Sequence, residues 1–237
     1  MNTLAPAERW KALAAKFGIY ALAGLVAGAI GLGIVTFRGG MRLVTITSGQ
    51  EGRFTDNGAI AGEFTLEGTL FLLLAGTVLG MVLSLLIGLV REGTRTKAWI
   101  ATLIFTPLVT RLLLLDPDNP DFVRFGPAWV AVATFTLGVA LYLALVGLLV
   151  DRLESRWHLP RPLLMVAGVV GSGFLVLAFL GSGGVGLVPL LGLAFLVAMV
   201  GGLWTGSAWH APVARVLLWG GAVIGLIIWV QATVQIL

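Results

Sequence analysis

The residues that could carry out chemistry in this chain are few, and they lie apart from one another. Cysteine is absent and histidine occurs twice, as His158 and His210. Without cysteine there is no disulfide, thiolate metal site or thiol nucleophile, and two histidines are one ligand short of a catalytic zinc site. The sequence around Ser172 resembles a serine-nucleophile turn, but no histidine stands within the apolar stretches to act as its base. We therefore interpret Ser172 as a packing residue and both histidines as solvated loop residues.

The acidic run Asp116-Pro-Asp118-Asn-Pro-Asp121 raises the question of a calcium site. An EF-hand loop has glycine at its sixth position and glutamate at its twelfth, whereas Asp121 and Pro127 occupy those positions here. Asp-Pro and Asn-Pro pairs are typical of turns. We expect a stiff acidic turn, and the sequence predicts neither a metal nor a cofactor.

Three arginines, Arg38, Arg42 and Arg111, stand near the ends of apolar stretches. Arg111 lies four residues before Leu115, hence about 6 Å inside the end of its stretch at 1.5 Å per residue. One interpretation is that its side chain reaches the headgroups or pairs with a nearby acid. The alternative hypothesis is an anion or lipid-headgroup site that Arg38, Arg42 and Arg111 form together.

The elements that must position these residues are membrane-spanning helices. Of the 237 residues, 58% are hydrophobic and 11% are charged, and the mean hydropathy is +1.02, whereas soluble domains carry about 25% charged residues. So few charges cannot cover a water-facing surface, and we expect one membrane domain over residues 1–237 with the lipid bilayer as its partner. The net charge of +4 is spread over short loops, without the block of like charges that would indicate a nucleic-acid partner.

Seven apolar stretches predict an all-α bundle of about seven transmembrane helices, because each is long enough to cross about 30 Å of hydrocarbon. The stretches are 17–37, 66–90, 98–115, 127–150, 163–181, 185–204 and 213–236. Residues 1–16 are expected to form a cytoplasmic lead-in at the membrane interface. The stretch 98–115 is the weakest, because it contains Pro107 and Arg111.

The lysines and arginines indicate the orientation of these helices. With seven spans, ten of the 15 fall on the side of the amino terminus and five on the other side. Cytoplasmic loops carry the excess of lysine and arginine, so the amino terminus is predicted to be cytoplasmic and the carboxyl terminus to lie outside. With six spans this separation fails, because Arg91, Arg95 and Lys97 would join the acidic turn 116–121 on one side.

The second stretch carries a small residue at every fourth position: Gly76, Gly80, Ser84 and Gly88. Residues four apart share a helix face, and small residues let membrane helices approach closely. We expect this stripe to pack within the chain, and a contact with another copy is the alternative.

The longest loop, residues 38–65, is predicted to form a small β-hairpin outside the membrane. Residues 42–47 are rich in β-branched side chains, and Asp56-Asn57-Gly58 is a tight-turn sequence. A hairpin alone is marginally stable in water, so it should rest on the helix ends. Binding residues are common on loops that a rigid scaffold supports, which makes this segment the first place to look for function.

Two motifs bracket that loop. Phe37-Arg-Gly-Gly-Met-Arg-Leu-Val44 ends the first stretch, and Phe64-Thr-Leu-Glu-Gly-Thr-Leu-Phe71 opens the second. Together they resemble a pattern in uncharacterised bacterial multi-pass inner-membrane proteins, over the first third of the chain. The resemblance implies a bacterial inner membrane and supplies no site residues.

Three functions compete for this sequence. Apart from Arg111, no stretch holds an acidic, basic or histidine side chain at its middle, which argues against a proton pump or intramembrane catalysis. The sequence favours a non-enzymatic scaffold, assembly partner or subunit of a membrane complex, with another membrane protein or a homo-oligomer as partner. A small-solute facilitator is the alternative and requires a polar cavity at mid-membrane. A lipid-active enzyme ranks last, because it requires His158, His210 and Asp151 in one cleft.

Overall fold

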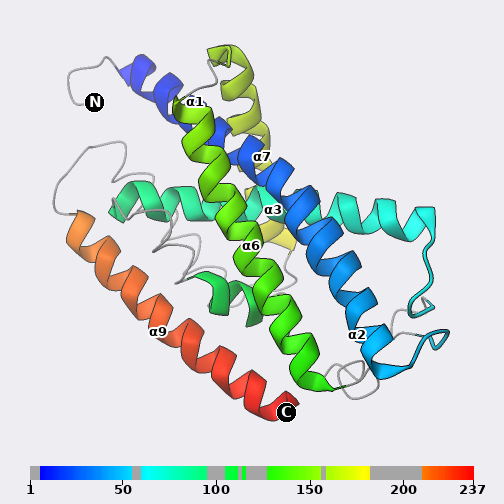
Figure 1. Cartoon of the computed structure of the whole chain (residues 1–237). Helices are drawn as coiled ribbons and strands as arrows, with labels where there is room; N and C mark the ends of the chain where they lie inside the picture. The colour runs from blue at the N-terminus through cyan, green and yellow to red at the C-terminus, as the bar shows by residue number, and fades with distance from the viewer. Residues whose placement is uncertain are drawn as a thin grey trace.

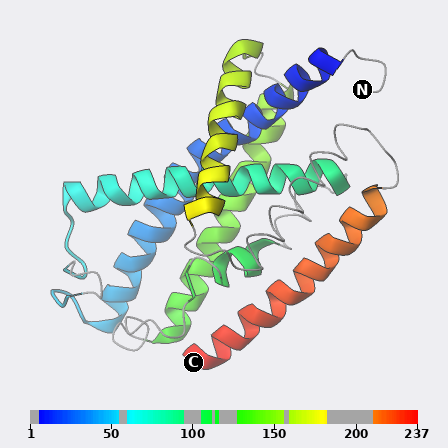
Figure 2. The ribbon, with the colours of Figure 1, turned by 180° about the vertical axis from the view of Figure 1, so that it is seen from behind.

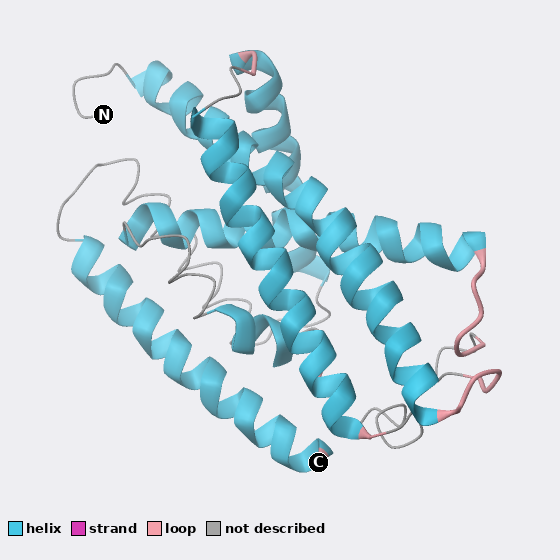
Figure 3. Cartoon of the chain, viewed as in Figure 1, coloured by secondary structure: helices cyan, strands magenta, loops and turns pink. Residues whose placement is uncertain are grey.

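Helices account for most of the described chain (Figure 1). The computed structural model describes residues 6–54, 60–94, 105–111, 114–115, 127–155, 159–181 and 210–237. Its elements are α1 (Pro6–Ala27), the π-helix η1 (Gly28–Gly40), α2 (Met41–Ser48), α3 (Leu66–Thr94), α6 (Ala128–Ser155), α7 (Arg161–Gly181) and α9 (His210–Ile236). Within these ranges Figure 3 shows helices and loops and no strand, which confirms the prediction of a helical chain.

Three of the helical segments are long and apolar enough to cross a membrane. They are Trp10–Ser48, Leu66–Gly88 and Ala128–Ser155. Shorter apolar segments, Arg161–Ser172 and Ala222–Ile236, lie in α7 and α9. Of the remaining expected spans, 98–115 is described at residues 105–111, which are helical, and at 114–115, while 185–204 lies outside the described residues. The count of seven spans stays a prediction.

The first span belongs to one uninterrupted helical rod, α1–η1–α2, which runs diagonally through Figure 1. The backbone is right-handed helical at both junctions, with φ −63° and ψ −35° at Ala27 and φ −60° and ψ −41° at Met41. The rod ends at Gly49, whose φ of 64° lies in the left-handed region that glycine adopts readily. The helix therefore continues well beyond Phe37, where the sequence predicts the first span to end.

The π-helix changes which residues of the rod share a face. Hydrogen bonds in a π-helix join residues five apart, so positions five apart stack as positions four apart do in an α-helix. Gly24, Gly28 and Gly33 follow this change, with a spacing of four and then five, and all three contact α3. The change of helix type thus keeps one line of glycines turned toward α3.

Helix α3 meets the rod through backbone contacts. A Cβ atom at Gly80 would stand 2.6 Å from the Gly24 carbonyl oxygen, and a Cβ atom at Gly76 would stand 2.6 Å from the Cα of Gly33. Side chains at these positions would hold the two backbones apart, whereas glycine allows them to touch. Figure 2 shows α3 crossing the rod steeply.

The same face of α3 continues toward its carboxyl end. Ser84 donates a hydrogen bond of 2.7 Å to the Tyr20 carbonyl oxygen of α1, and Gly88 lies against the Tyr20 ring. All four members of the small-residue stripe therefore face α1 and η1 within this chain: Gly76, Gly80, Ser84 and Gly88.

Helix α6 packs along the rod and also reaches α3. Three residues of η1 spaced five and four apart, Gly31, Thr36 and Gly40, meet three residues of α6, Tyr142, Gly138 and Phe135. Tyr142 is fully buried, and its hydroxyl donates a hydrogen bond of 2.7 Å to the Gly80 carbonyl oxygen. One side chain therefore ties α6 to the point where α3 crosses the rod.

The helix ends sort into two groups, which we call the Arg91 end and the Val44 end. At the Arg91 end, Arg91 of α3 pairs with Asp151 of α6, and the charge of Arg161 at the start of α7 acts on Glu8 at the start of α1. At the Val44 end, one apolar cluster joins α2, the loop after it, the start of α6 and the end of α9 through Val44, Ala61, Leu115, Val130, Ala131, Val132, Phe135 and Ala232. The rod therefore runs away from the Arg91 end, and α3 and α6 run toward it.

The prediction of a β-strand over residues 42–47 is wrong, because this segment forms α2. Propagating an existing helix needs no new nucleus, so α2 continues from η1. The hydroxyls of Thr45 and Thr47 donate hydrogen bonds of 2.9 Å to the carbonyls of Arg42 and Leu43, which threonine does readily inside helices. In the described part of the loop, β-structure is limited to an isolated antiparallel bridge between Phe54 and Ile60. The turn 56–58 lies outside the described residues.

Candidate functional site

Arg38 and Arg42 fasten the loop after α2 to the end of the rod. The Arg38 guanidinium donates a hydrogen bond of 3.0 Å to the Glu63 carbonyl oxygen and stands 4.1 Å from the centroid of the Phe64 ring. This is within the range of a cation–π contact. The Arg42 guanidinium donates a hydrogen bond of 2.6 Å to the carbonyl oxygen at position 62 and pairs with the Glu51 carboxylate at 2.9 Å. We call this group of Arg38, Arg42, Glu51 and residues 62–64 the arginine clasp.

The arginine clasp depends on a glycine at its centre. Gly62 has a φ of 82°, which favours glycine, and a Cβ atom there would stand 2.9 Å from an Arg42 guanidinium nitrogen. Two backbone hydrogen bonds close the loop beside it, from the Gly52 N–H to the Ala61 carbonyl at 2.9 Å and from the Ala61 N–H to the Arg53 carbonyl at 2.7 Å. The loop thus presents a fixed backbone to the two arginines.

The clasp leaves part of each guanidinium group available. Arginine has five N–H donors in a planar fork that suits carboxylate and phosphate oxygens. Among the described residues, the hydrogen bonds and the ion pair of Arg38 and Arg42 engage one nitrogen of each guanidinium. The Arg42 side chain is 52% exposed. Glu51 already compensates part of its charge, so an anion would have to compete with that carboxylate or bind to the remaining donors.

Arg111 is held separately from the arginine clasp. Its guanidinium donates a hydrogen bond of 2.7 Å to the Leu115 carbonyl oxygen, and Leu115 is buried in the same apolar cluster as Val44. All three predicted arginines therefore belong to the Val44 end. Among the described residues, Arg111 shares no hydrogen-bond partner with Arg38 or Arg42, and their joint anion site stays a prediction.

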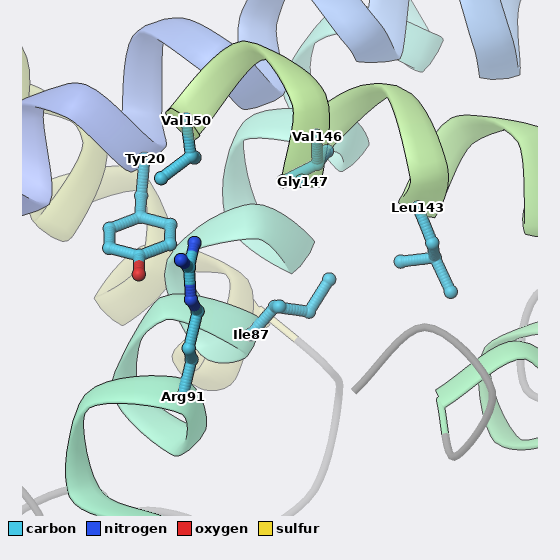
Figure 4. A pocket seen from close by; sticks show the side chains of 7 residues that line it. All are labelled: Tyr20, Ile87, Arg91, Leu143, Val146, Gly147 and Val150. Carbon is cyan, nitrogen blue, oxygen red and sulfur yellow. The ribbon is translucent and has the colours of Figure 1, made fainter. Parts of the chain in front are cut away.

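A second polar site, at the Arg91 end, escaped the sequence analysis. Arg91 donates a hydrogen bond of 3.0 Å to the Asp151 carboxylate. Figure 4 shows its guanidinium beside the Tyr20 ring, at a small cavity of about 10 Å³ between α1, α3 and α6. That volume suits about one water molecule. The signal available in the sequence was an arginine and an aspartate that directly follow two spans predicted to end on one side.

The electrostatics of this site keep Arg91 charged. Burial lowers the pKa of Arg91, but Tyr20 and then the carboxylates of Asp151 and Glu154 raise it, and the resulting pKa lies above the usual arginine value. The charge is therefore permanent, and it ties the end of α3 to the end of α6. A site that holds its own counter-ion and room for one water is suited to fixing helices rather than to binding a large ligand.

The other residues considered for chemistry are not brought together in the described part of the chain. His210 is the first residue of α9, while His158 and the acidic turn 116–121 lie outside the described residues. Asp151 is engaged by Arg91. No group of three side chains that could hold a metal ion is found among the described residues.

Buried polar side chains in the described helices are hydroxyl-bearing: Thr36, Thr45, Ser84, Thr106 and Thr110. Together with the Tyr142 hydroxyl, those of Thr36, Ser84 and Thr110 donate hydrogen bonds to backbone carbonyls. Three further buried polar atoms on α6 and α9 have no hydrogen-bond partner among the described residues: Thr136 Oγ1, Trp229 Nε1 and Thr233 Oγ1. In these ranges the interior therefore contains no acid, base or histidine that could carry a proton through it.

No protein-family model, curated protein or solved structure matches the chain.

Proposed function

We propose that this chain is a non-enzymatic protein of the bacterial inner membrane that serves as a scaffold, assembly partner or subunit of a membrane complex. The observation that carries the proposal is the packing of the described interior, where helices meet through glycine backbones and the buried polar groups are hydroxyls and the indole N–H of Trp229. Such an interior fixes the positions of the helices, and it lacks the ionisable groups that mark ion pathways and proton relays. The function then depends on the surfaces of the bundle.

The proposal includes seven spans, a cytoplasmic amino terminus and an external carboxyl terminus. Support comes from the sorting of the helix ends, because the Arg91 end gathers the start of α1 with the ends of α3 and α6. The sequence assigns ten of the 15 lysines and arginines to this side, and such an excess belongs in the cytoplasm. The Val44 end, with the arginine clasp, would then face outward.

A small-solute facilitator is less well supported by the same geometry. A facilitator needs a polar pathway that reaches the middle of the membrane. Where α1, η1, α3 and α6 meet, glycine backbones and the Tyr142 side chain fill the space instead. The cavity beside Arg91 has room for about one water and lies at the end of the bundle.

For the arginine clasp we propose contact with lipid phosphate or another anion, in which Arg111 takes part. Two observations support it: Arg38 and Arg42 have donors that no described residue engages, and the three arginines share a position at the Val44 end. Replacing Arg111 with alanine should reduce the amount of anionic lipid that copurifies with the protein, measured by mass spectrometry of extracted lipid. Unchanged lipid binding ends this part of the proposal.

The scaffold proposal is tested by purification from membranes in a mild detergent. We expect the chain to be recovered either as a defined oligomer or with a companion membrane protein at a fixed ratio, measured by light scattering and mass spectrometry. An unrelated multi-pass protein with the same tag serves as the control for nonspecific companions. A homogeneous monomer without a companion contradicts the proposal.

A further inference from the structure

The carboxylate of Glu51 lies in the arginine clasp in the way that a bound anion would. One of its oxygens stands 2.9 Å from an Arg42 guanidinium nitrogen, which is the distance of a charge-assisted hydrogen bond between a guanidinium and an oxyanion. Among the described residues, Glu51 is the carboxylate that pairs with a guanidinium of the clasp. One side chain of the protein therefore demonstrates that an oxyanion fits at Arg42.

The two guanidinium groups of the clasp are held in place by neutral acceptors. Arg42 and Arg38 donate to the carbonyl oxygens of positions 62 and 63 at 2.6 Å and 3.0 Å. A carbonyl group is uncharged, so these hydrogen bonds orient the guanidinium groups without neutralising them. Because the two carbonyls belong to consecutive residues, whose Cα atoms are about 3.8 Å apart, the two positive charges lie near each other. An anion that binds to the clasp meets charges whose side-chain freedom the fold has already restricted.

The ion pair between Glu51 and Arg42 is weak enough to exchange. The Arg42 and Glu51 side chains are 52% and 53% exposed. Exposed ion pairs contribute little stability, because water screens the charges and two long side chains lose freedom. Water and dissolved anions also reach both members of such a pair. The Glu51 carboxylate can therefore leave Arg42 at a small cost.

Glu51 and a second anion oppose each other at Arg42. The nitrogen that meets Glu51 also donates to the position-62 carbonyl, so both of its hydrogens are engaged. An anion that binds at the end of the guanidinium fork needs the nitrogen that Glu51 occupies. An anion that binds at the side of the fork stands close to the Glu51 carboxylate, and like charges on one guanidinium repel. In both arrangements, binding is coupled to the departure of Glu51.

We infer that the arginine clasp is a phosphate site and that Glu51 is its internal competitor. The inference rests on the proposed contact of the clasp with an anion, and it adds the chemistry of the ligand and the residue that regulates its binding. A phosphate group fits better than a second carboxylate, because its several oxygens can accept from two guanidinium groups, whereas the Glu51 carboxylate meets Arg42 alone. A lipid headgroup and free inorganic phosphate both supply such a group.

Phosphate binding to the full-length protein in maltoside micelles tests the inference, because this detergent contains no phosphate. Glu51→Gln removes the competing charge and keeps the size of the side chain. Since the competitor is held by an exposed ion pair, its loss should tighten phosphate binding about 2- to 6-fold. Glu67→Gln is the matched control, because it removes the same charge from the first turn of α3, outside the clasp. It should leave phosphate binding nearly unchanged.

Two probes distinguish the sources of the phosphate group. Inorganic phosphate is followed by phosphorus NMR, and phosphatidylglycerol by mass spectrometry of the intact protein with its bound lipid. Tighter binding of phosphatidylglycerol alone in Glu51→Gln assigns the site to a lipid headgroup, and tighter binding of inorganic phosphate alone assigns it to the free ion. Tighter binding of both supports the inference for either source. The gain should disappear when Glu51→Gln is combined with Arg42→Gln, because the guanidinium that Glu51 releases is then missing.

Equal affinities of the wild-type protein and Glu51→Gln for both probes overturn the inference. A gain that Glu67→Gln reproduces, or one that survives Arg42→Gln, does so as well. Failure of Glu51 as a competitor is distinguishable from failure of the proposed anion contact. If the wild-type protein binds a probe and Arg42→Gln weakens this binding while Glu51→Gln does not change it, the competitor is excluded and the anion contact stands. If neither the wild-type protein nor Glu51→Gln binds a probe, both are wrong.

Discussion

The contact of Gly80 with the rod offers a direct test of how these helices pack. In Gly80→Ala the new Cβ would stand 2.6 Å from the Gly24 carbonyl oxygen and 3.0 Å from the Gly28 nitrogen. Both are backbone atoms, which no rotation of a side chain can move away. Ordinary contact begins at 3.4 Å, and the Gly28 Cα would be closer to the new Cβ than the Gly24 oxygen is. Because close packing leaves no slack, α3 and the rod must separate by at least about 0.8 Å at this point.

The expected loss of stability has two parts. Overpacking of a close contact costs about 1–3 kcal/mol. Separation also strains the hydrogen bond from Tyr142 to the Gly80 carbonyl, whose loss costs about 1 kcal/mol. We therefore expect Gly80→Ala to lower the free energy of unfolding by roughly 2–4 kcal/mol.

Equilibrium unfolding in mixed micelles of mild detergent and dodecyl sulfate, followed by circular dichroism, measures this loss. Gly39→Ala is the matched control on the same rod, because its Cβ would meet only the Ile34 carbonyl oxygen, at 3.4 Å. An ordinary contact of that length should leave stability nearly unchanged. If Gly80→Ala and Gly39→Ala have the same free energy of unfolding, α3 and the rod do not touch through their backbones, and the described packing of the core is wrong.

Three further outcomes are expected. Tyr142→Phe should cost about 1 kcal/mol in the same assay, because only the hydroxyl bond to α3 is lost. The Arg91→Ala and Asp151→Ala double-mutant cycle should give a coupling below about 1 kcal/mol that declines with salt, because the Asp151 side chain is 60% exposed. Arg42→Ala should release the loop and speed tryptic cleavage after the exposed Arg53, and Arg42→Lys should give an intermediate rate of cleavage. If the clasp faces outward, trypsin should cut at Arg53 in spheroplasts. Protection of Arg53 in spheroplasts but not in inverted vesicles would reverse the proposed orientation.

The helical class could be predicted because long apolar stretches with few charges are typical of membrane-spanning helices. In hydrocarbon the backbone must satisfy its own hydrogen bonds, and a helix does so within one segment. The spacing of Gly76, Gly80, Ser84 and Gly88 likewise indicated a contact face, because a period of four is a geometric property of the helix. Both inferences rest on local rules that apply whatever the neighbours are.

The segment 42–47 shows where such rules fail. Its β-branched residues favour a strand by propensity, but propensity differences are small compared with the stability gained by extending an existing helix. The arginine clasp was anticipated only in part, since the sequence singled out Arg38 and Arg42 but not Glu51 or the carbonyls that receive them. The Arg91–Asp151 pair joins residues far apart in the chain, and only the arrangement of α3 and α6 brings them together.

The π-helix has a consequence for any scan of substitutions or probes along the first span. Positions that touch α3 recur at 24, 28 and 33, and positions that touch α6 recur at 31, 36 and 40. On a helical wheel drawn with 100° per residue the two sets intermingle, because Gly33 falls beside Gly40 and Gly31 falls beside Gly24. Plotted with the wider turn of η1, the sensitive positions fall into two lines, and the side of the rod free for lipid becomes visible between them.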